Sequence, residues 1–135
     1  MKQGSLVRVL AAMAVAGVVL GACQRVQPMY NVASHPVPAS AQRLPLKTIE
    51  QTILDAAVAR KWNVDRVRPG VLHAKQKWRE HMAEVEIRYS QESYSIQHRS
   101  SVNLKEQGDE IHRSYNKLVH ALEDEIERRL YRAGY

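Results

Sequence analysis

Apolar residues recur at helical spacing over the last part of this 135-residue chain. The polar residues between them, such as Arg113, Lys117 and Asp124, fall on the opposite side of the predicted helix. Gly108 or Asp109 can begin this helix, and its single apolar stripe indicates that it packs on one face of a sheet. The stripe consists of Ile111, Tyr115, Leu118, Val119, Leu122, Ile126 and Leu130.

A second helix is predicted just after Pro45, where the helical period appears again. Thr48 followed by Gln51 forms a capping-box pattern. Trp62-Asn63-Val64 breaks the period and allows a short strand, and Pro69-Gly70 marks a turn. The helical positions are Ile49, Ile53, Ala56, Ala57 and Arg60, with Leu46 ahead of them.

Between the helices, three segments alternate apolar and polar residues, which is typical of half-buried strands. They cover residues 72–78, 83–89 and 94–100. Two-residue turns at Glu80-His81 and Gln91-Glu92 give a register with an apolar inner face. Neither turn has the favoured Asn-Gly sequence, so a longer loop with another pairing remains an alternative.

This register predicts which side chains lie opposite one another on each face. The inner rows are Leu72–Tyr89–Tyr94, Ala74–Ile87–Ile96, Gln76–Val85–His98 and Trp78–Ala83–Ser100. The outer pairs are Lys75 with Glu86, Lys77 with Glu84, and Glu84 with Arg99.

The order of these elements predicts an α+β fold. We expect an N-terminal helix, a three- or four-stranded antiparallel meander and a C-terminal amphipathic helix, with both helices on one sheet face. Residues 45–135 are long enough for one small domain. With no disulfide and no evident metal ligand set, a hydrophobic core has to stabilise it.

Residues 23–44 are predicted to be a flexible tether that begins at Cys23. The segment from Gln24 to Leu44 contains three prolines and shows no helical or strand periodicity. Extended, about 20 such residues reach roughly 70 Å, enough to hold a domain away from a membrane. Met29 and Tyr30 either dock on the domain or a partner, or belong to a solvated linker.

Residues 1–22 have the pattern of a secretory signal peptide. Lys2 and Arg8 are the only charges there, and an uncharged apolar run follows from Val9 to Gly21. The run is short for a membrane-spanning helix, which needs about 20 apolar residues. A retained signal anchor is the alternative.

The residues Leu20, Gly21, Ala22 and Cys23 resemble a bacterial lipobox. The resemblance implies a diacylglyceryl group on the sulfur of Cys23, cleavage before that residue, and a membrane anchor of two or three acyl chains. Cys23 is the only cysteine, so it cannot form an internal disulfide. The alternative is an ordinary secreted protein with an incidental cysteine.

Gln24 bears on the location of such a lipoprotein in the bacterial cell envelope. In enteric-type bacteria an aspartate at this position commonly retains a lipoprotein in the inner membrane. Its absence favours the outer membrane, with the domain facing the periplasm; surface display is the alternative. Removal of Lys2 and Arg8 leaves 18 Lys and Arg against 14 Asp and Glu, so the net charge falls from +6 to +4. The charges are interleaved, which does not indicate nucleic-acid binding.

A set of dispersed residues resembles a group of small proteobacterial lipoproteins of unknown function. The similarity covers Ile49 to about Leu130 and implies the fold, with no catalytic residues to carry over. The family usually has an aromatic residue where His98 stands. The matching residues are Trp62 and Val64, Pro69-Gly70, Val85, Ile87 and Tyr89, Tyr94-Ser95-Ile96, Asn103-Leu104, Ile111-His112 and Tyr115-Asn116.

The histidines are the strongest candidates for chemistry, but their spacing does not predict a site. His112 and His120 share a helix side without a third donor, which does not fit a metal site. His98 is expected to face inward beside Gln76 as a structural residue. Ser100 and Ser101 lack a nucleophile-elbow glycine pattern, and no glycine-rich phosphate loop is present. We therefore predict no catalytic residue, no metal site and no cofactor.

Two functions remain open from the sequence. The first is a lipid-anchored, non-catalytic interaction module that binds another envelope protein or a cell-wall component. The second is a carrier or sensor of a small apolar ligand in a cleft between helix and sheet, where Trp62 and Trp78 could line the cleft. Large aromatics in a domain of this size are more often part of the core. An exposed strand edge or patch favours the first function, and an apolar cavity favours the second.

Overall fold

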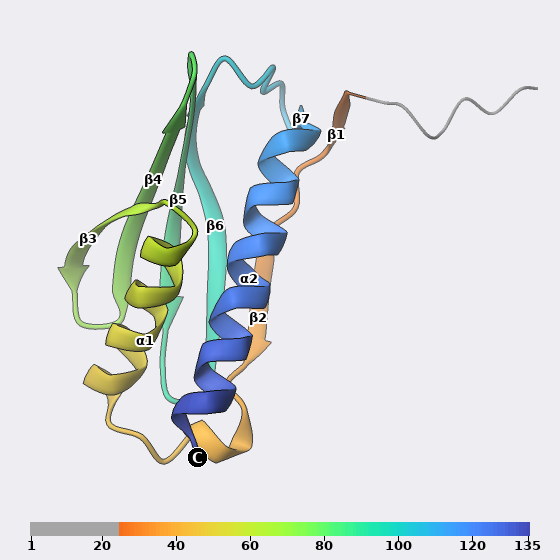
Figure 1. Ribbon diagram of the computed structural model, residues 1–135. Coiled ribbons are helices and arrows are strands. Elements are labelled where there is room, and N and C mark those ends of the chain that lie inside the picture. Colours follow the sequence, from red (N-terminus) through yellow and green to blue (C-terminus); the bar gives the residue numbers. More distant parts are fainter. Residues whose placement is uncertain (1–24) are drawn as a thin grey trace, which may run out of the picture.

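The computed structural model describes residues 25–135, so the predicted signal peptide and Cys23 lie outside the described residues. Strands and helices combine in an α+β fold (Figure 1). The strands are β1 (Val26–Pro28), β2 (Val32–Pro36), β3 (Asn63–Arg68), β4 (Val71–Trp78), β5 (His81–Tyr89), β6 (Ser93–Val102) and β7 (Glu110–His112). The helices are α1 (Leu46–Ala59), α2 (Arg113–Ala133) and the short 3-10 helix η1 (Ala39–Ala41).

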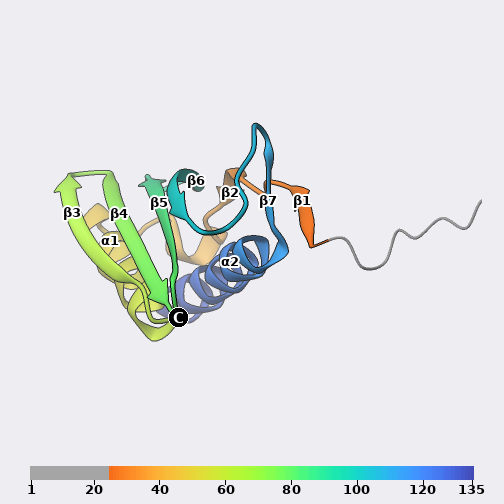
Figure 2. The same ribbon diagram turned by 90° about the horizontal axis from the view of Figure 1, so that it is seen from above.

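An antiparallel five-stranded sheet with the order β2-β6-β5-β4-β3 forms one layer, and β1 pairs separately with β7. Both long helices lie on the same side of the sheet (Figure 2). The α+β class is thus confirmed. The predicted meander is present as the consecutive strands β3 to β6, and β2 adds a fifth strand that the sequence analysis did not predict.

The prediction of a flexible tether is wrong for residues 25–44. Val32 in β2 pairs with Ile96, and Val26 in β1 pairs with His112. Val32, Val37 and Ala41 are buried at 4%, 1% and 0% exposure. The three prolines do not prevent this, because Pro28 and Pro36 end the short strands β1 and β2, where a missing amide donor is tolerated. The domain therefore begins by Arg25, and α1 is not its first element.

The strand registers agree with the prediction in part. Tyr89–Tyr94, Ile87–Ile96 and Val85–His98 are confirmed between β5 and β6, up to a bulge at Glu84 and Val85. Past the bulge, Ala83 faces Ser101 and not the predicted Ser100.

The predicted register between β4 and β5 is wrong by two residues: Leu72 faces Ile87, not Tyr89, and Trp78 faces His81. The turn is Arg79-Glu80, and Arg79 adopts the positive φ of 52° that tight hairpin turns use. On the outer face Lys75 consequently meets Glu84 at 3.6 Å and not the predicted Glu86.

Both helices contribute their predicted apolar stripes to the core. Ile49, Ile53, Ala56 and Ala57 of α1 are fully buried. The predicted capping box is not formed, because Pro45 is the N-cap and Thr48 already lies inside the helix. Proline at a helix start loses no hydrogen bond, since the first amides have no partner within the helix.

The C-terminal helix begins later than predicted. It starts at Arg113 and not at Gly108 or Asp109, because Glu110–His112 form β7. The His112 side chain caps it by accepting a hydrogen bond from the Ser114 amide. Along residues 25–135, no helix combines the length and the apolar character needed to cross a bilayer.

Candidate functional site

An open groove of about 770 Å³ lies between the N-terminal segment and the C-terminal half of α2. We call it the β2–α2 groove. One wall comes from the end of β2 and the residues after it, and the other comes from the last turns of α2. Its lining residues are His35, Pro36, Pro38, Asp124, Glu127, Arg128 and Tyr131.

Local backbone geometry places the first wall of this groove. A bulge between Val32 and His35 bends β2 at the sheet edge, as bulges commonly do. Beyond the strand, the Val37 amide donates to the Glu92 carbonyl at 2.9 Å and the Gln42 side chain donates to the Val37 carbonyl at 3.0 Å. These hydrogen bonds at Val37 therefore fix the backbone that carries its two neighbours, Pro36 and Pro38.

His35 forms the inner corner of the groove. Its ring stacks on Tyr94 with centroids 4.9 Å apart. Its Nδ1 lies 2.8 Å from Oε2 of Glu123, and its Nε2 lies 3.7 Å from Oε2 of Glu127. One imidazole thus joins β2, β6 and α2 through stacking and polar contacts together.

Tyr30 makes a second contact with the same carboxylate. Its hydroxyl donates to Oε1 of Glu123 at 2.6 Å, and its ring stacks on His120 with centroids 3.8 Å apart. The hydrogen bond to Glu123, with burial and the negative charge added, raises the pKa of Tyr30 to about 12. Burial, followed by the charge of Glu123, also raises the pKa of Tyr94.

Glu123 is therefore the centre of this group, which we call the Glu123 cluster: Tyr30, His35, Tyr94, His120 and Glu123. Burial alone would raise the pKa of Glu123, but the hydrogen bonds from Tyr30 and His35 outweigh it and lower the pKa. An ionised carboxylate with both oxygens engaged is a poor proton acceptor, and a tyrosine with a raised pKa is a poor donor. The geometry suits a structural clamp between the N-terminal segment and α2.

Asn116 provides a second clamp about two turns nearer the start of α2. Its Oδ1 accepts from the Tyr30 amide at 2.9 Å, and its Nδ2 donates to the Pro28 carbonyl at 2.9 Å. Asn116 is 8% exposed. A buried amide with both ends paired fixes the backbone between β1 and β2 against the helix.

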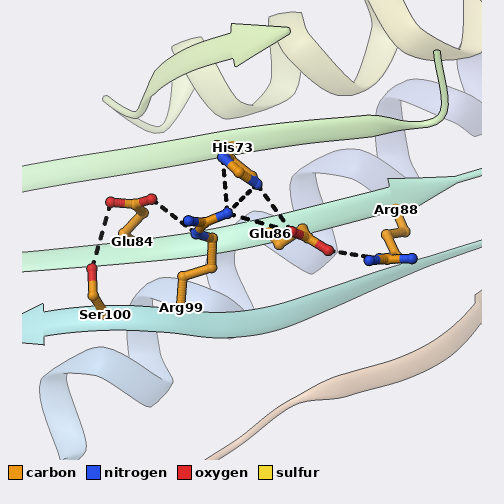
Figure 3. A network of polar contacts seen from close by, with 6 residues as sticks. All are labelled: His73, Glu84, Glu86, Arg88, Arg99 and Ser100. Atoms are coloured by element: carbon orange, nitrogen blue, oxygen red, sulfur yellow. Dashed lines mark hydrogen bonds and ion pairs between the residues drawn. The ribbon is translucent and has the colours of Figure 1, made fainter. Parts of the chain in front are cut away.

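The uncovered face of the sheet carries a network of charged side chains (Figure 3). Arg99 reaches Glu84 at 3.0 Å and Glu86 at 3.5 Å, and His73 contacts Glu86 at 3.0 Å. Arg88 lies 2.6 Å from Glu86, and the hydrogen bonds from Arg88 and His73 lower the pKa of Glu86 despite its burial. Carboxylates and cations neutralise one another here, as cross-strand pairs do on a solvated sheet face.

The structure places the histidines singled out in the sequence in separate surroundings. His98 faces inward as predicted, with a side chain 10% exposed. Its ring meets Tyr115 edge to face at 5.3 Å, and Nε2 lies 3.5 Å from Glu106. The predicted Gln76 partner is not bonded to it, since Nε2 of His98 and Oε1 of Gln76 are both buried without a hydrogen bond.

His112 and His120 do not meet: His112 caps α2, and His120 stacks on Tyr30. Among residues 25–135, no group of three or more His, Cys, Asp or Glu side chains is arranged to hold a metal ion. Ser100 and Ser101 contact Glu84 and Glu106 respectively.

The two tryptophans have different places. Trp62 belongs to the core at 2% exposure. Trp78 is half-buried against the core and lies 5.3 Å from the His81 ring. Neither lines the β2–α2 groove.

The sequence analysis missed the groove because its residues lie in the predicted tether and on the polar side of α2. Docking on the domain was one of the alternatives open for Met29 and Tyr30, and both are partly buried against the core without lining the groove. Comparison with protein-family models, with curated proteins and with solved structures found no match to this chain.

Proposed function

We propose that this chain is a lipoprotein of the bacterial cell envelope whose small domain is a non-catalytic interaction module. The observation that carries the proposal is the lipobox at Leu20–Cys23, directly ahead of a folded domain that begins by Arg25. Acyl chains on Cys23 would hold the domain at the membrane. Gln24, where retained lipoproteins commonly carry aspartate, favours the outer membrane with the domain facing the periplasm.

The β2–α2 groove is the surface that supports recognition of a partner. It combines the apolar faces of Pro36 and Pro38 with the 55%-exposed ring of Tyr131 and with the charges of Asp124, Glu127 and Arg128. Tyrosine and arginine are enriched at protein interfaces. An open groove of this mixed character suits a segment of another envelope protein or of the cell wall.

A carrier of a small apolar ligand is the second candidate, because the groove volume of about 770 Å³ would admit such a molecule. The residues that line the groove favour the interaction module instead. The groove is open to solvent, and His35, Asp124, Glu127 and Arg128 place imidazole, carboxylate and guanidinium groups in its wall. Sites for small ligands instead bury most of the ligand surface and contain few polar groups.

Acyl labelling of the full chain tests the anchor. Cys23→Ser is expected to abolish incorporation of labelled palmitate and to leave the precursor unprocessed, because only a thiol forms the thioether. Gln24→Ser is the matched control and should keep the label. Labelling that persists in Cys23→Ser would contradict the proposal.

Site-specific photo-crosslinking in intact cells tests the groove. A photoreactive residue at Tyr131 is expected to capture a discrete partner, whereas one at exposed Lys117 on α2 should not. Equal capture at both positions, or none at Tyr131, would count against the groove as the binding surface.

A further inference from the structure

A turn, a loop and a strand pair gather at the end of the domain where the described chain begins. The β4–β5 turn, the β6–β7 loop and the β1–β7 pair lie at that end, and the C-terminus lies at the other (Figure 1). We call it the proximal end, defined by Arg25, Arg79, Val102, Lys105 and Arg113.

Backbone hydrogen bonds hold Arg25 in place there. The Arg113 amide donates to the Arg25 carbonyl at 2.7 Å, and Val26 pairs with His112. Cys23 is two residues before Arg25, and two residues of chain span at most about 7 Å. A group carried by Cys23 is therefore confined to the proximal end. The predicted tether of about 20 residues would have left the same group free to move away from the domain.

Backbone hydrogen bonds bring three cations together at this end: the Arg113 amide donates to the Arg25 carbonyl, and the His112 amide donates at 2.7 Å to the carbonyl of Leu104, the residue before Lys105. Burial, and then the positive charges of Lys105, Arg113, His81 and Arg25, lower the pKa of His112. Arg25, Lys105 and Arg113 are exposed. Within residues 25–135 none of the three forms an ion pair.

The acids of the same end are Glu80, Glu106, Asp109 and Glu110. The Ser101 hydroxyl donates to Glu106 at 2.6 Å, and Nε2 of His98 lies 3.5 Å from the same carboxylate without a hydrogen bond. Glu80, Asp109 and Glu110 are exposed and, within residues 25–135, form no ion pair either. They are outnumbered by the exposed, unpaired cations of this end, which are Arg25, Lys77, Arg79, Lys105 and Arg113. This excess of positive charge suits contact with a layer of lipid phosphates.

An exposed valine beside a half-buried methionine adds to this surface. Val102 is 53% exposed and lies opposite Met82 on the outer sheet face, in a hollow shared with Lys77 and Arg79. Apolar side chains flanked by lysine and arginine suit the boundary between lipid headgroups and acyl chains. Long basic side chains can keep their charged ends in the headgroup layer there.

We infer that the acylated protein rests its proximal end on the phospholipid headgroup layer, with Arg25, Lys105 and Arg113 contacting lipid phosphates. This inference rests on the proposed function. The β2–α2 groove then stands away from the bilayer: Tyr131 is 18 residues beyond Arg113 along α2, which is about 27 Å at 1.5 Å per residue.

Fluorescence quenching tests this orientation on the full chain, acylated in cells and reconstituted into vesicles of phosphatidylethanolamine and phosphatidylglycerol. Cys23 is the only cysteine, and its thiol is consumed by acylation, so an introduced cysteine can be labelled alone. A fluorophore at Val102→Cys should be quenched by a headgroup-attached nitroxide, whereas one at Arg43→Cys, near the far end, should not. Equal quenching at both positions, or stronger quenching at Arg43, would overturn the orientation.

Charge variants test the phosphate contacts. Arg25→Gln, Lys105→Gln and Arg113→Gln together should reduce quenching at position 102. The control of equal charge, Arg43→Gln, Lys47→Gln and Arg132→Gln, should leave it unchanged. Equal effects of the two sets, or no effect of the first in a variant with an unaltered circular dichroism spectrum, would overturn these contacts.

Mass spectrometry of the reconstituted protein separates the two levels of the proposal. An unmodified Cys23 would overturn the lipoprotein assignment and the orientation with it. An acylated Cys23 with equal quenching at the two label positions would overturn the orientation alone.

Discussion

The N-terminal segment, residues 25–41, and the meander β3–β6 are held in the domain by different forces. Continuous apolar rows stabilise the meander, in which Leu72, Val85, Ile87 and Ile96 are fully buried. Beside its backbone pairing with β6 and β7, the segment has only three buried side chains and depends on the two polar clamps at Asn116 and Glu123. Hydrophobic burial is spread over many contacts, whereas a clamp depends on single partners, so we expect the segment to open before the meander does.

A cavity in the meander should have the largest effect. Ile87→Ala removes a fully buried side chain from the central strand β5 and should lower the free energy of unfolding by about 2–5 kcal/mol. Chemical denaturation of the variant and the wild type measures this difference in the free energy of unfolding. Val67→Ala on edge strand β3, where the side chain is 43% exposed, should cost no more than about 0.5 kcal/mol. Comparable losses for the two variants would show that burial in the apolar rows does not stabilise the meander.

Loss of the carboxylate at the centre of the Glu123 cluster should have a smaller and local effect. Glu123→Gln removes the charged acceptor of Tyr30 and His35 and should cost about 1–3 kcal/mol. Hydrogen exchange should speed up in residues 25–41 and stay nearly constant in β5. Asp124→Asn, an exposed neighbour, is the control; exchange that rises equally in β5 would remove the distinction between the two regions.

Acid should weaken the same clamp. The pKa of Glu123 is lower in the folded protein than its ordinary value of 4.5. Its contribution to stability is therefore fully present above pH 4.5 and is lost as the pH falls through the folded value. Hydrogen exchange of residues 25–41 should accelerate in that window more in the wild type than in Glu123→Gln. Parallel pH profiles would assign the acid sensitivity to other carboxylates.

The charged network on the open sheet face should matter least. Arg88→Gln removes one exposed partner of Glu86, and exposed ion pairs contribute about 0–1 kcal/mol. Thermal melting at low and high salt measures the effect, which should nearly vanish at high salt. If Arg88→Gln lowered the free energy of unfolding as much as Glu123→Gln does, the network would stabilise the domain as strongly as the Glu123 cluster.

These regions also differ in how far the sequence could predict them. Alternation in β4–β6 and the stripe of α2 gave the correct buried faces, because each period depends on local geometry alone. The β4–β5 register was wrong because a shift of two residues keeps the same side chains inward, so the apolar pattern cannot tell Leu72–Ile87 from Leu72–Tyr89.

The N-terminal segment could not be predicted from such periods. Val32, Val37 and Ala41 follow no repeat, and β2 pairs with β6, some sixty residues later in the chain. The Glu123 cluster joins Tyr30 and His35 to a helix about ninety residues away, so its members share no local motif. Met29 and Tyr30, two large apolar side chains in a segment rich in small and polar residues, were the only local indication that the segment docks.

The two edges of the sheet are poor templates for a sixth strand. At one edge β3 is interrupted by a bulge between Arg66 and Arg68 and carries both arginines; at the other, β2 has a bulge and ends at Pro36. Bulges, charges and proline at edges discourage main-chain pairing between molecules. Copies of this domain at high local concentration would therefore resist joining their sheets edge to edge, and any contact between them would have to use side chains.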